Sequence, residues 1–381
     1  MSQVDEHVVA NGLKESLQSA YKAGHSTETA LLKVSSDLLQ ASDEGKVSLL
    51  TLLDLSAAFD TIDHSILLER LNISFGLSDI VLKWFESYMC NRHQTVVVGE
   101  HKSSPSLLDY GVPQDSVLGP VLFSLYSQSL SSILRDHDFN YHFYADDSQL
   151  QTSFEKSQVK SVTDSLSDCL TDVSAWMVVN KLKLNENKTE VIVTGTPSNV
   201  QAVNLSSLKI CGQEIHTTST VKNLGVLLDS GLSMDKHISH LRKTCYHELR
   251  KISHIRPYLS KESTTKLVCS LVTSRLDYCN ALLAGLPDCK LKKLQQIQNN
   301  AARLTMKTSK RDHITPILKE LHWLPIQFRI RYKISVIVYQ CINNPYYPHY
   351  LKDLVKVYTP SRTLRSSYYH LLCTPRCNLN G

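Results

Sequence analysis

The sequence contains no long apolar run and no apolar core near its N-terminus. No segment of the 381 residues approaches the roughly 18 consecutive apolar residues of a membrane span. The first residues, Met1 to His7, are mostly polar, so they do not indicate a secretory signal. Ten cysteines are scattered without a zinc-finger spacing, which favours free thiols in a reducing compartment. We therefore expect a nuclear or cytoplasmic protein that has no membrane partner.

Acidic residues are missing from one stretch of the C-terminal part. Between Lys290 and Arg311 the chain has lysines and arginines but no aspartate or glutamate. Between Lys236 and Arg256 the basic residues outnumber the single acid, Glu248. The charge of the whole chain is only +5, so this is an asymmetry between regions. This asymmetry is typical of a catalytic region followed by a region that binds a polyanion. A helix surface exposed to solvent would carry the same charges.

Hydrophobic periodicity predicts mixed strands and helices up to about Met234 and mostly helices after it. This order predicts the α+β fold class, with a domain boundary near Met234. Predicted helices lie at 27–40, 62–71, 117–134 and 162–179, and predicted strands lie at 47–54, 207–211 and 221–228. The segment 95–99 is predicted to be a strand and a turn, and a strand–turn–strand is predicted both at 182–193 and around Asp146.

Three carboxylates occur in apolar sequence segments, where burying a negative charge costs free energy. Asp146 and Asp147 are adjacent within a short segment of aromatic and apolar residues, and Asp54 ends the apolar run 47–53. Desolvation and mutual repulsion both oppose such a pair, and a divalent cation relieves both effects. Two strands that each end in an acid are typical of a hard-metal site for phosphoryl transfer. Asp147 is predicted to be an auxiliary ligand, because successive side chains point to opposite faces of a strand.

The motifs around these acids resemble those of a known family. They are, in order, Asp54-Leu55-Ser56-Ala57-Ala58-Phe59-Asp60, Gly111-Val112-Pro113-Gln114 and Tyr144-Ala145-Asp146-Asp147. Together they resemble the palm motifs of a reverse transcriptase. The segments 24–32, 176–190 and 321–326 resemble those of non-LTR retrotransposons, the LINE-type or jockey-like elements. The resemblance covers about residues 10 to 355.

The resemblance implies an RNA-directed DNA polymerase with a right-hand fold. It implies partial fingers at 1–45, a palm at 46–234 with an antiparallel sheet and helices, and an α-helical thumb and C-terminal region at 235–381. It also implies an RNA template, a DNA primer, dNTP substrates and two Mg²⁺ or Mn²⁺ ions. The roles carried over are metal binding by Asp54, Asp146 and Asp147, a steric gate against the ribose 2′-hydroxyl at Phe59, nucleotide contact by Gln114, triphosphate contact by Lys22, and protonation of pyrophosphate by Lys188. The alternative for Lys22 and for Lys188 is an ordinary exposed surface lysine.

Two departures from the family pattern bear on activity. The family's loop reads Gly-Val-Pro-Gln-Gly-Ser, but Asp115 replaces its second glycine. Glycine would permit a positive φ there, whereas aspartate adds a side chain and a charge; alternatively, Asp115 is the N-cap of a helix that starts at Ser116. The upstream finger motif and an N-terminal endonuclease are also missing, so we expect an N-terminally truncated fragment. The alternative function is a catalytically impaired remnant that at most binds nucleic acid.

Overall fold

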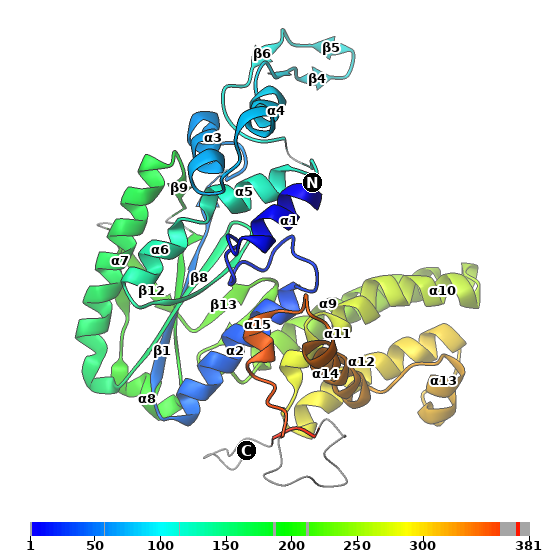
Figure 1. Cartoon of the computed structure of the whole chain (residues 1–381). Coiled ribbons are helices and arrows are strands. Elements are labelled where there is room, and N and C mark those ends of the chain that lie inside the picture. Colours follow the sequence, from blue (N-terminus) through cyan, green and yellow to red (C-terminus); the bar gives the residue numbers. More distant parts are fainter. Residues whose placement is uncertain are drawn as a thin grey trace. The chain divides into compact units, whose positions relative to one another are not determined.

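The computed structural model describes residues 2–56, 58–113, 115–185, 188–210, 213–358 and 371–373 (Figure 1). Its contacts divide the chain into two compact units. The first unit comprises Met1–Lys22, Leu49–Val191 and Val203–Thr217, and the second comprises Ala23–Ser48, Ile192–Ala202 and Thr218–Gly381. Within the described ranges, no helix is both long enough and apolar enough to cross a membrane.

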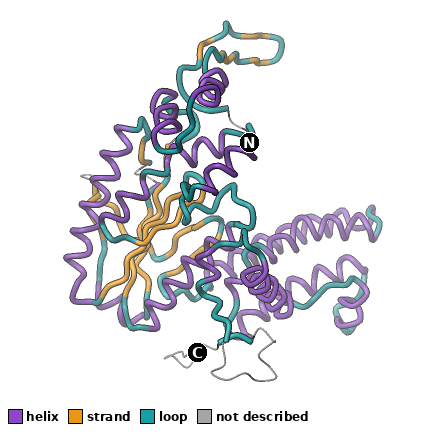
Figure 2. Tube along the Cα trace, in the orientation of Figure 1, coloured by secondary structure: helices purple, strands orange, loops and turns teal. Residues whose placement is uncertain are grey.

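A six-stranded sheet has the strand order β11-β12-β10-β1-β8-β7. Its strands are β1 (Val47–Leu53), β7 (Asn140–Tyr144), β8 (Asp147–Phe154), β10 (Glu190–Thr194), β11 (Ser207–Ile210) and β12 (Gln213–Thr218). β7 and β8 are antiparallel, and so are β11 and β12. Strand β1 is almost wholly buried, because its neighbours β10 and β8 flank it and its sequence is a nearly continuous apolar run. Figure 2 shows these strands in orange.

Short strands pair outside this sheet. They are β2 (Leu55–Ser56) with β9 (Lys183–Leu184), β3 (His93–Gln94) with β6 (Ser106–Leu107), β4 (Val97–Val98) with β5 (His101–Lys102), and β13 (Thr220–Asn223) with β14 (Val226–Asp229). The β2–β9 pair matters for the site, because it directly follows β1 and joins Leu55 to Leu184.

The first unit contains six α-helices and a 3-10 turn within the described residues. They are α1 (Ser2–Ala10), α3 (His64–Ile73), α4 (Asp79–Met89), α5 (Gly119–Ser127), α6 (Leu130–Asp136), the 3-10 turn η1 (Lys156–Gln158) and α7 (Val159–Val179). Helix α7 contacts α6, β8, β9 and β11. Its buried residues Leu166, Leu170, Val173 and Met177 recur every three or four positions, so one apolar face of the helix packs inward.

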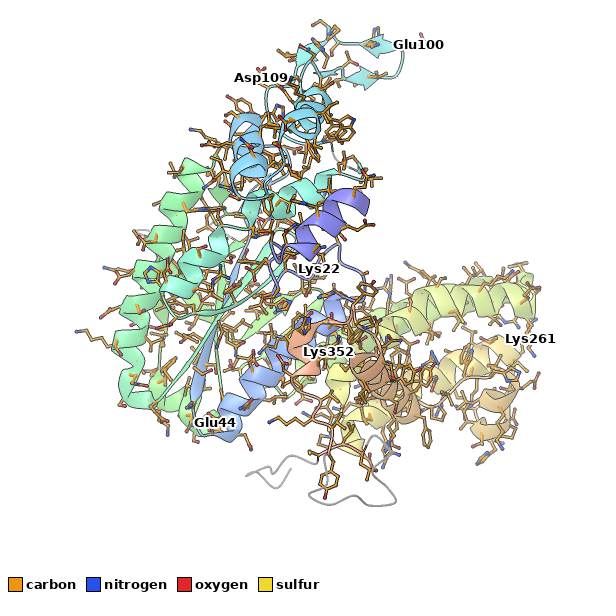
Figure 3. All side chains as sticks on the ribbon, viewed as in Figure 1. Lys22, Glu44, Glu100, Asp109, Lys261 and Lys352 are labelled. Carbon is orange, nitrogen blue, oxygen red and sulfur yellow. The ribbon has the colours of Figure 1, made fainter. Side chains whose placement is uncertain are left out.

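The second unit is mainly helical. It contains α2 (Thr27–Asp43), α9 (Asp235–Ile255), η3 (Arg256–Tyr258), α10 (Lys261–Val268), η4 (Cys269–Thr273), α11 (Ser274–Asp277), η5 (Asn280–Leu283), α12 (Asp288–Met306), α13 (Ile314–Glu320), α14 (Ile326–Asn343) and α15 (His349–Lys352), while α8 is Pro197–Val203. Helix α2 begins with a capping box, in which the Ser26 side chain accepts a hydrogen bond from the Thr29 N–H. Lys261 at the start of α10 pairs with Glu320 at the end of α13, with 2.6 Å between Nζ and Oε1 (Figure 3).

The α+β class and most predicted elements are confirmed, with two corrections. The single helix predicted at 117–134 is wrong, because α5 ends at Ser127 and α6 begins at Leu130. Side chains occupy this break: Gln128 Nε2 donates to the Leu13 carbonyl at 2.6 Å, and Trp176 Nε1 donates to Ser129 Oγ at 3.1 Å. The single strand predicted at 221–228 is the β13–β14 hairpin. The predicted division into fingers, palm and thumb stays a prediction.

Candidate active site

Asp54 lies directly between β1 and β2. Its carbonyl accepts a hydrogen bond from the Asn185 N–H at 2.9 Å, so the backbone on both sides of the carboxylate is fixed by β1 and by the β2–β9 pair. One carboxylate oxygen, Oδ2, is buried and accepts no hydrogen bond. The Lys188 Nζ lies 3.3 Å from this oxygen and forms an ion pair with it. The structure therefore joins the predicted Asp54 and Lys188.

Asp146 and Asp147 lie at the turn of the β7–β8 hairpin. Tyr144 pairs with Asp147, so Ala145 and Asp146 form the two-residue turn and Asp147 is the first residue of β8. Ala145 has a φ of +57°, where hairpin turns prefer glycine. The Gln18 side chain holds this turn by accepting from the Ala145 N–H at 3.1 Å and donating to the Ala145 carbonyl at 3.3 Å. Because β8 neighbours β1, the turn and Asp54 belong to adjacent strands.

The three carboxylates interact electrostatically. Burial, together with the charges of Asp146 and Asp54, raises the pKa of Asp147 to about 6, although Lys188 opposes the shift. Asp147 is exposed on one side, but the protein atoms packed around it still weaken its hydration. Burial also raises the pKa of Asp146, where Asp54 adds to the effect and a backbone hydrogen bond and Lys188 oppose it. The site therefore holds a surplus of negative charge.

The donor set fits a hard divalent cation. All three side chains are carboxylates, and Asp54 Oδ2 is a buried oxygen without a hydrogen-bond donor. As the side chains are placed, no group of three acidic, histidine or cysteine residues in the described part of the chain is tight enough to hold a metal ion. The chemistry of the donors and their charge thus favour a divalent cation.

Backbone hydrogen bonds join the segment that contains Phe59 to the loop that begins at Gly111. The Gly111 N–H donates to the Ile62 carbonyl at 2.8 Å, and the Val112 N–H donates to the Phe59 carbonyl at 2.9 Å. Gly111 has a φ of +84°, and a Cβ atom there would lie 2.9 Å from the Asp60 carbonyl oxygen, so only glycine fits without a shift. Phe59 is half-buried and packs on Phe123, with ring centroids 4.8 Å apart. Phe59 thus lies in a turn against the helix α5.

Asp115 adopts the conformation that glycine would favour. Its φ is +55°, and its side chain is exposed. The alternative in which Asp115 caps a helix at Ser116 is wrong, because α5 begins at Gly119. Ser116 makes the local bonds instead: its Oγ donates to the Pro113 carbonyl at 2.6 Å and accepts from the Gly119 N–H at 2.9 Å. Gln114, the predicted nucleotide contact, lies outside the described residues.

Lys22 lies in a small hollow of the first unit (Figure 3). Its Nζ donates to the Glu15 carbonyl at 2.6 Å. Burial, together with the nearby charge of Lys14, lowers the pKa of Lys22 to about 8, although Glu15 and Asp5 oppose the shift. The neighbouring Tyr21 does lie near the acids, because Asp146 contributes to raising its pKa after burial. A triphosphate contact by Lys22 therefore stays a prediction.

Two positioning residues were missed by sequence reasoning. Gln18 holds the Ala145 turn, and Asn185 binds the Asp54 carbonyl through its backbone. Both contacts join residues more than 120 positions apart. Gln18 lies in none of the family-like segments, and Asn185 lies in the segment 176–190 but acts through its backbone, which no side-chain pattern reveals.

Comparisons with known proteins place these features in a family. The model of the family "Reverse transcriptase (RNA-dependent DNA polymerase)" matches residues 4–228. The "Probable RNA-directed DNA polymerase from transposon BS" of Drosophila melanogaster is 28% identical over 284 residues, which are 70% of this chain and 30% of that protein. The "RNA-directed DNA polymerase from mobile element jockey" of Drosophila funebris is 25% identical over 295 residues, which are 75% of this chain and 31% of that protein.

A solved structure, apo telomerase from Candida tropicalis, aligns with a TM-score of 0.46 and 15% identity, covering 84% of this chain and 50% of that chain. The chain spans about 30% of the length of the curated relatives. These findings confirm the predicted resemblance to non-LTR retrotransposons, and family membership confirms the right-hand polymerase fold class. The chain belongs to the reverse transcriptase family.

Proposed function

We propose that this chain is an RNA-directed DNA polymerase domain of a non-LTR retrotransposon. It would transfer a nucleotide from dNTP to the 3′-hydroxyl of a DNA primer on an RNA template. The observation that carries the proposal is the meeting of Asp54 with the Asp146–Asp147 turn on adjacent strands, with Lys188 beside them. Localisation in the nucleus or the cytoplasm, and the division into partial fingers, palm and thumb, belong to the same proposal.

Each site residue would have a separate role in nucleotide transfer. Asp54, Asp146 and Asp147 would hold two Mg²⁺ or Mn²⁺ ions, which neutralise charge on the attacking and leaving oxygens. Lys188, whose side chain is exposed and whose Nζ lies 3.3 Å from Asp54 Oδ2, would give a proton to the departing pyrophosphate. Phe59, braced by Phe123, would exclude a ribose 2′-hydroxyl by its bulk. Gln114 and Lys22 would contact the incoming nucleotide, as the family motifs imply.

Helix α9 supports binding of a nucleic acid backbone. One exposed stripe consists entirely of basic and histidine side chains at alternating spacings of four and three residues: Lys236, His240, Lys243, His247, Arg250 and His254. The acids of α9 are neutralised, because Asp235 pairs with Lys290 at 3.0 Å and Glu248 pairs with Lys251 at 3.7 Å. Such a stripe can follow a row of phosphates.

One observation favours the second candidate, a catalytically impaired remnant that at most binds nucleic acid. Asp115 places a non-glycine residue at a φ of +55° in the loop that follows Gly111. Its negative charge would oppose the approach of a triphosphate. The remnant would keep the α9 stripe and bind RNA, but it would extend primers poorly or not at all.

Primer extension decides between the two candidates. The full chain is given a DNA primer on an RNA template, dNTPs and Mg²⁺ or Mn²⁺, beside Asp146→Ala. Asp164→Ala is the matched control, because Asp164 is an exposed aspartate on α7. Extension by the wild type and Asp164→Ala that Asp146→Ala abolishes supports the polymerase. Equal extension by all three would rule out the proposed site, and salt-dependent RNA binding without extension would support the remnant.

The role of Lys188 has its own test. Lys188→Arg keeps a cation beside Asp54, but a guanidinium does not release its proton near neutral pH. We expect a fall in kcat with little change in KM for dNTP, whereas Lys188→Gln changes both. Full kcat in Lys188→Arg would show that only the charge matters.

A further inference from the structure

The helix α14 presents an exposed aromatic stripe. Phe328, Tyr332 and Tyr339 are 49%, 65% and 62% exposed, although large apolar rings are usually covered. Their spacings of four and seven residues put them on one face of the helix. At a rise of about 1.5 Å per residue, the rings lie roughly 6 and 10 Å apart along the axis. The opposite face is held in the unit by Ile326, Ile330 and Cys341.

A groove lies at the N-terminal end of this stripe. It has a volume of about 620 Å³, within the range of ligand sites. Its lining residues come from α13, the following turn and α14: Thr315, Leu318, Lys319, His322, Trp323, Leu324, Pro325 and Phe328. Phe328 therefore belongs to both features, so the groove and the stripe form one continuous surface.

The turn that shapes the groove is held in place by hydrogen bonds. His322 has a φ of +54° and ends α13, and the Trp323 N–H donates to the Leu318 carbonyl at 2.9 Å. The Gln298 side chain donates to the Leu324 carbonyl at 2.8 Å. Trp323 also packs on the buried cluster of Ala302, Ile317 and Leu318. The groove exists before a ligand binds, so binding does not have to order this turn.

The charges around the surface favour an anionic ligand. From Leu321 to Lys352 the chain has no aspartate or glutamate. Arg331 lies over the Phe328 ring, with 5.8 Å between Cζ and the ring centroid. Lys319, which lines the groove, and Arg331 form no ion pair within the described ranges.

Nearby acids are already paired. Glu320 pairs with Lys261, Asp277 with Arg329, and Glu28 with Lys333. A stripe of open rings beside cations and without free acids is the pattern that binds unpaired bases and their phosphates. A purely apolar protein partner would leave the cations without counter-charges.

We propose that the groove at Trp323 and the α14 stripe form a second nucleic-acid site, which binds an unpaired strand by stacking its bases on Phe328, Tyr332 and Tyr339. The site is separate from the carboxylates and does not require that the chain polymerise. Arg331 and Lys319 would contact the phosphates. A duplex would bind poorly, because its bases are already stacked on each other.

Oligonucleotide binding tests the proposal. The full chain is titrated with a fluorescent 12-nucleotide oligouridine RNA and with a blunt RNA duplex of the same length. Tyr332→Leu and Phe328→Leu keep apolar bulk but remove the stacking face, and each should weaken oligouridine binding about tenfold. Tyr332→Phe should bind as the wild type does. Tyr258→Ala is the matched control, because Tyr258 is an exposed tyrosine on η3.

Salt separates this site from the cationic stripe of α9. The leucine variants remove no charge, so their loss of affinity should be the same factor at 50 and at 300 mM salt. Wild-type affinity in both leucine variants would overturn the proposal. An unchanged oligouridine affinity combined with altered self-association in sedimentation would also overturn it, because α14 would then be a protein interface. Failure here leaves primer extension intact, and an inactive polymerase site leaves this binding intact.

Discussion

Replacing Asp115 separates the effect of its charge from that of its backbone. Asp115 has a φ of +55°, and Ser116 holds the loop on both sides through Pro113 and Gly119. Glycine adopts this φ freely, asparagine tolerates it, and alanine pays about 1 kcal/mol or more. We therefore expect Asp115→Gly and Asp115→Asn to unfold at the same or higher urea concentration than the wild type. Asp115→Ala should be about 1 kcal/mol less stable than Asp115→Gly.

Activity should follow a different order, because it depends on the charge. A like charge about 10 Å from a phosphate is worth roughly 0.4 to 1.7 kcal/mol at an effective dielectric constant between 80 and 20. This range is about a 2- to 15-fold change in affinity. Primer extension should thus show a lower KM for dNTP in the glycine, asparagine and alanine variants alike.

The two readouts make the reasoning refutable. Incorporation that stays at the wild-type rate in Asp115→Gly and Asp115→Asn would show that Asp115 does not limit activity. A gain in Asp115→Gly alone would assign the effect to the backbone, and the argument from charge would be wrong. The stability order tests the loop conformation independently of any catalysis.

Three further predictions concern the second unit. Lys243→Gln with Arg250→Gln should reduce the slope of log affinity for RNA against log salt by about 1.4 to 1.8, and an unchanged slope would mean that the α9 stripe does not contact phosphates. Burial lowers the pKa of His237 to about 4, so the unfolded chain binds more protons than the folded chain between pH 6.5 and 4. The free energy of unfolding should therefore fall by about 3 kcal/mol as the pH drops from 6.5 to 4. Urea titrations of His237→Asn should lack this loss, and an identical pH profile would contradict it. The buried Arg256 side chain donates hydrogen bonds to the carbonyls of Leu259, Leu304 and Thr305. Arg256→Lys should therefore lower the free energy of unfolding, measured by urea denaturation, by about 3 kcal/mol. A loss below 1 kcal/mol would show that these bonds contribute little to stability.

The three acids could be predicted from the sequence because the apolar residues that make a charge unfavourable are their immediate neighbours in the chain. Asp54 ends an apolar run and Asp146 follows the apolar and aromatic segment Phe143-Tyr144-Ala145, and both patterns are visible without a fold. The pairing of Lys188 with Asp54 could be proposed only through the family, because 134 positions separate them. The β2–β9 pair, the Asn185–Asp54 backbone hydrogen bond and the neighbouring strands β1 and β10 bring these two segments together, and two-residue strands leave no periodicity.

Errors arose where polar side chains override a hydrophobic pattern. The apolar residues at 117–134 fit one helix, but the Ser127, Gln128 and Ser129 side chains bond to the backbone and to Trp176, and they divide it. The role of Gln18 was invisible for a related reason. Its function depends on a turn 127 residues away, and an amide side chain alone suggests no chemistry.

Backbone strain marks the site more sharply than its composition does. Many non-glycine residues with positive φ simply end helices, such as Lys181 after α7 and Lys307 after α12. Ala145 and Asp115 follow no helix, and each lies in a motif of the family. A glycine at either position would remove the strain, so local stability does not explain these residues. At Ala145 the Gln18 side chain compensates and keeps Asp146 and Asp147 in position. Among the described residues, no side chain bonds to the Asp115 backbone in this way, and Ser116 stabilises the loop around it while its carboxylate is exposed. The strain at Ala145 thus coincides with a side chain that supports the carboxylates, whereas the gain expected on substitution of Asp115 comes from removal of its charge.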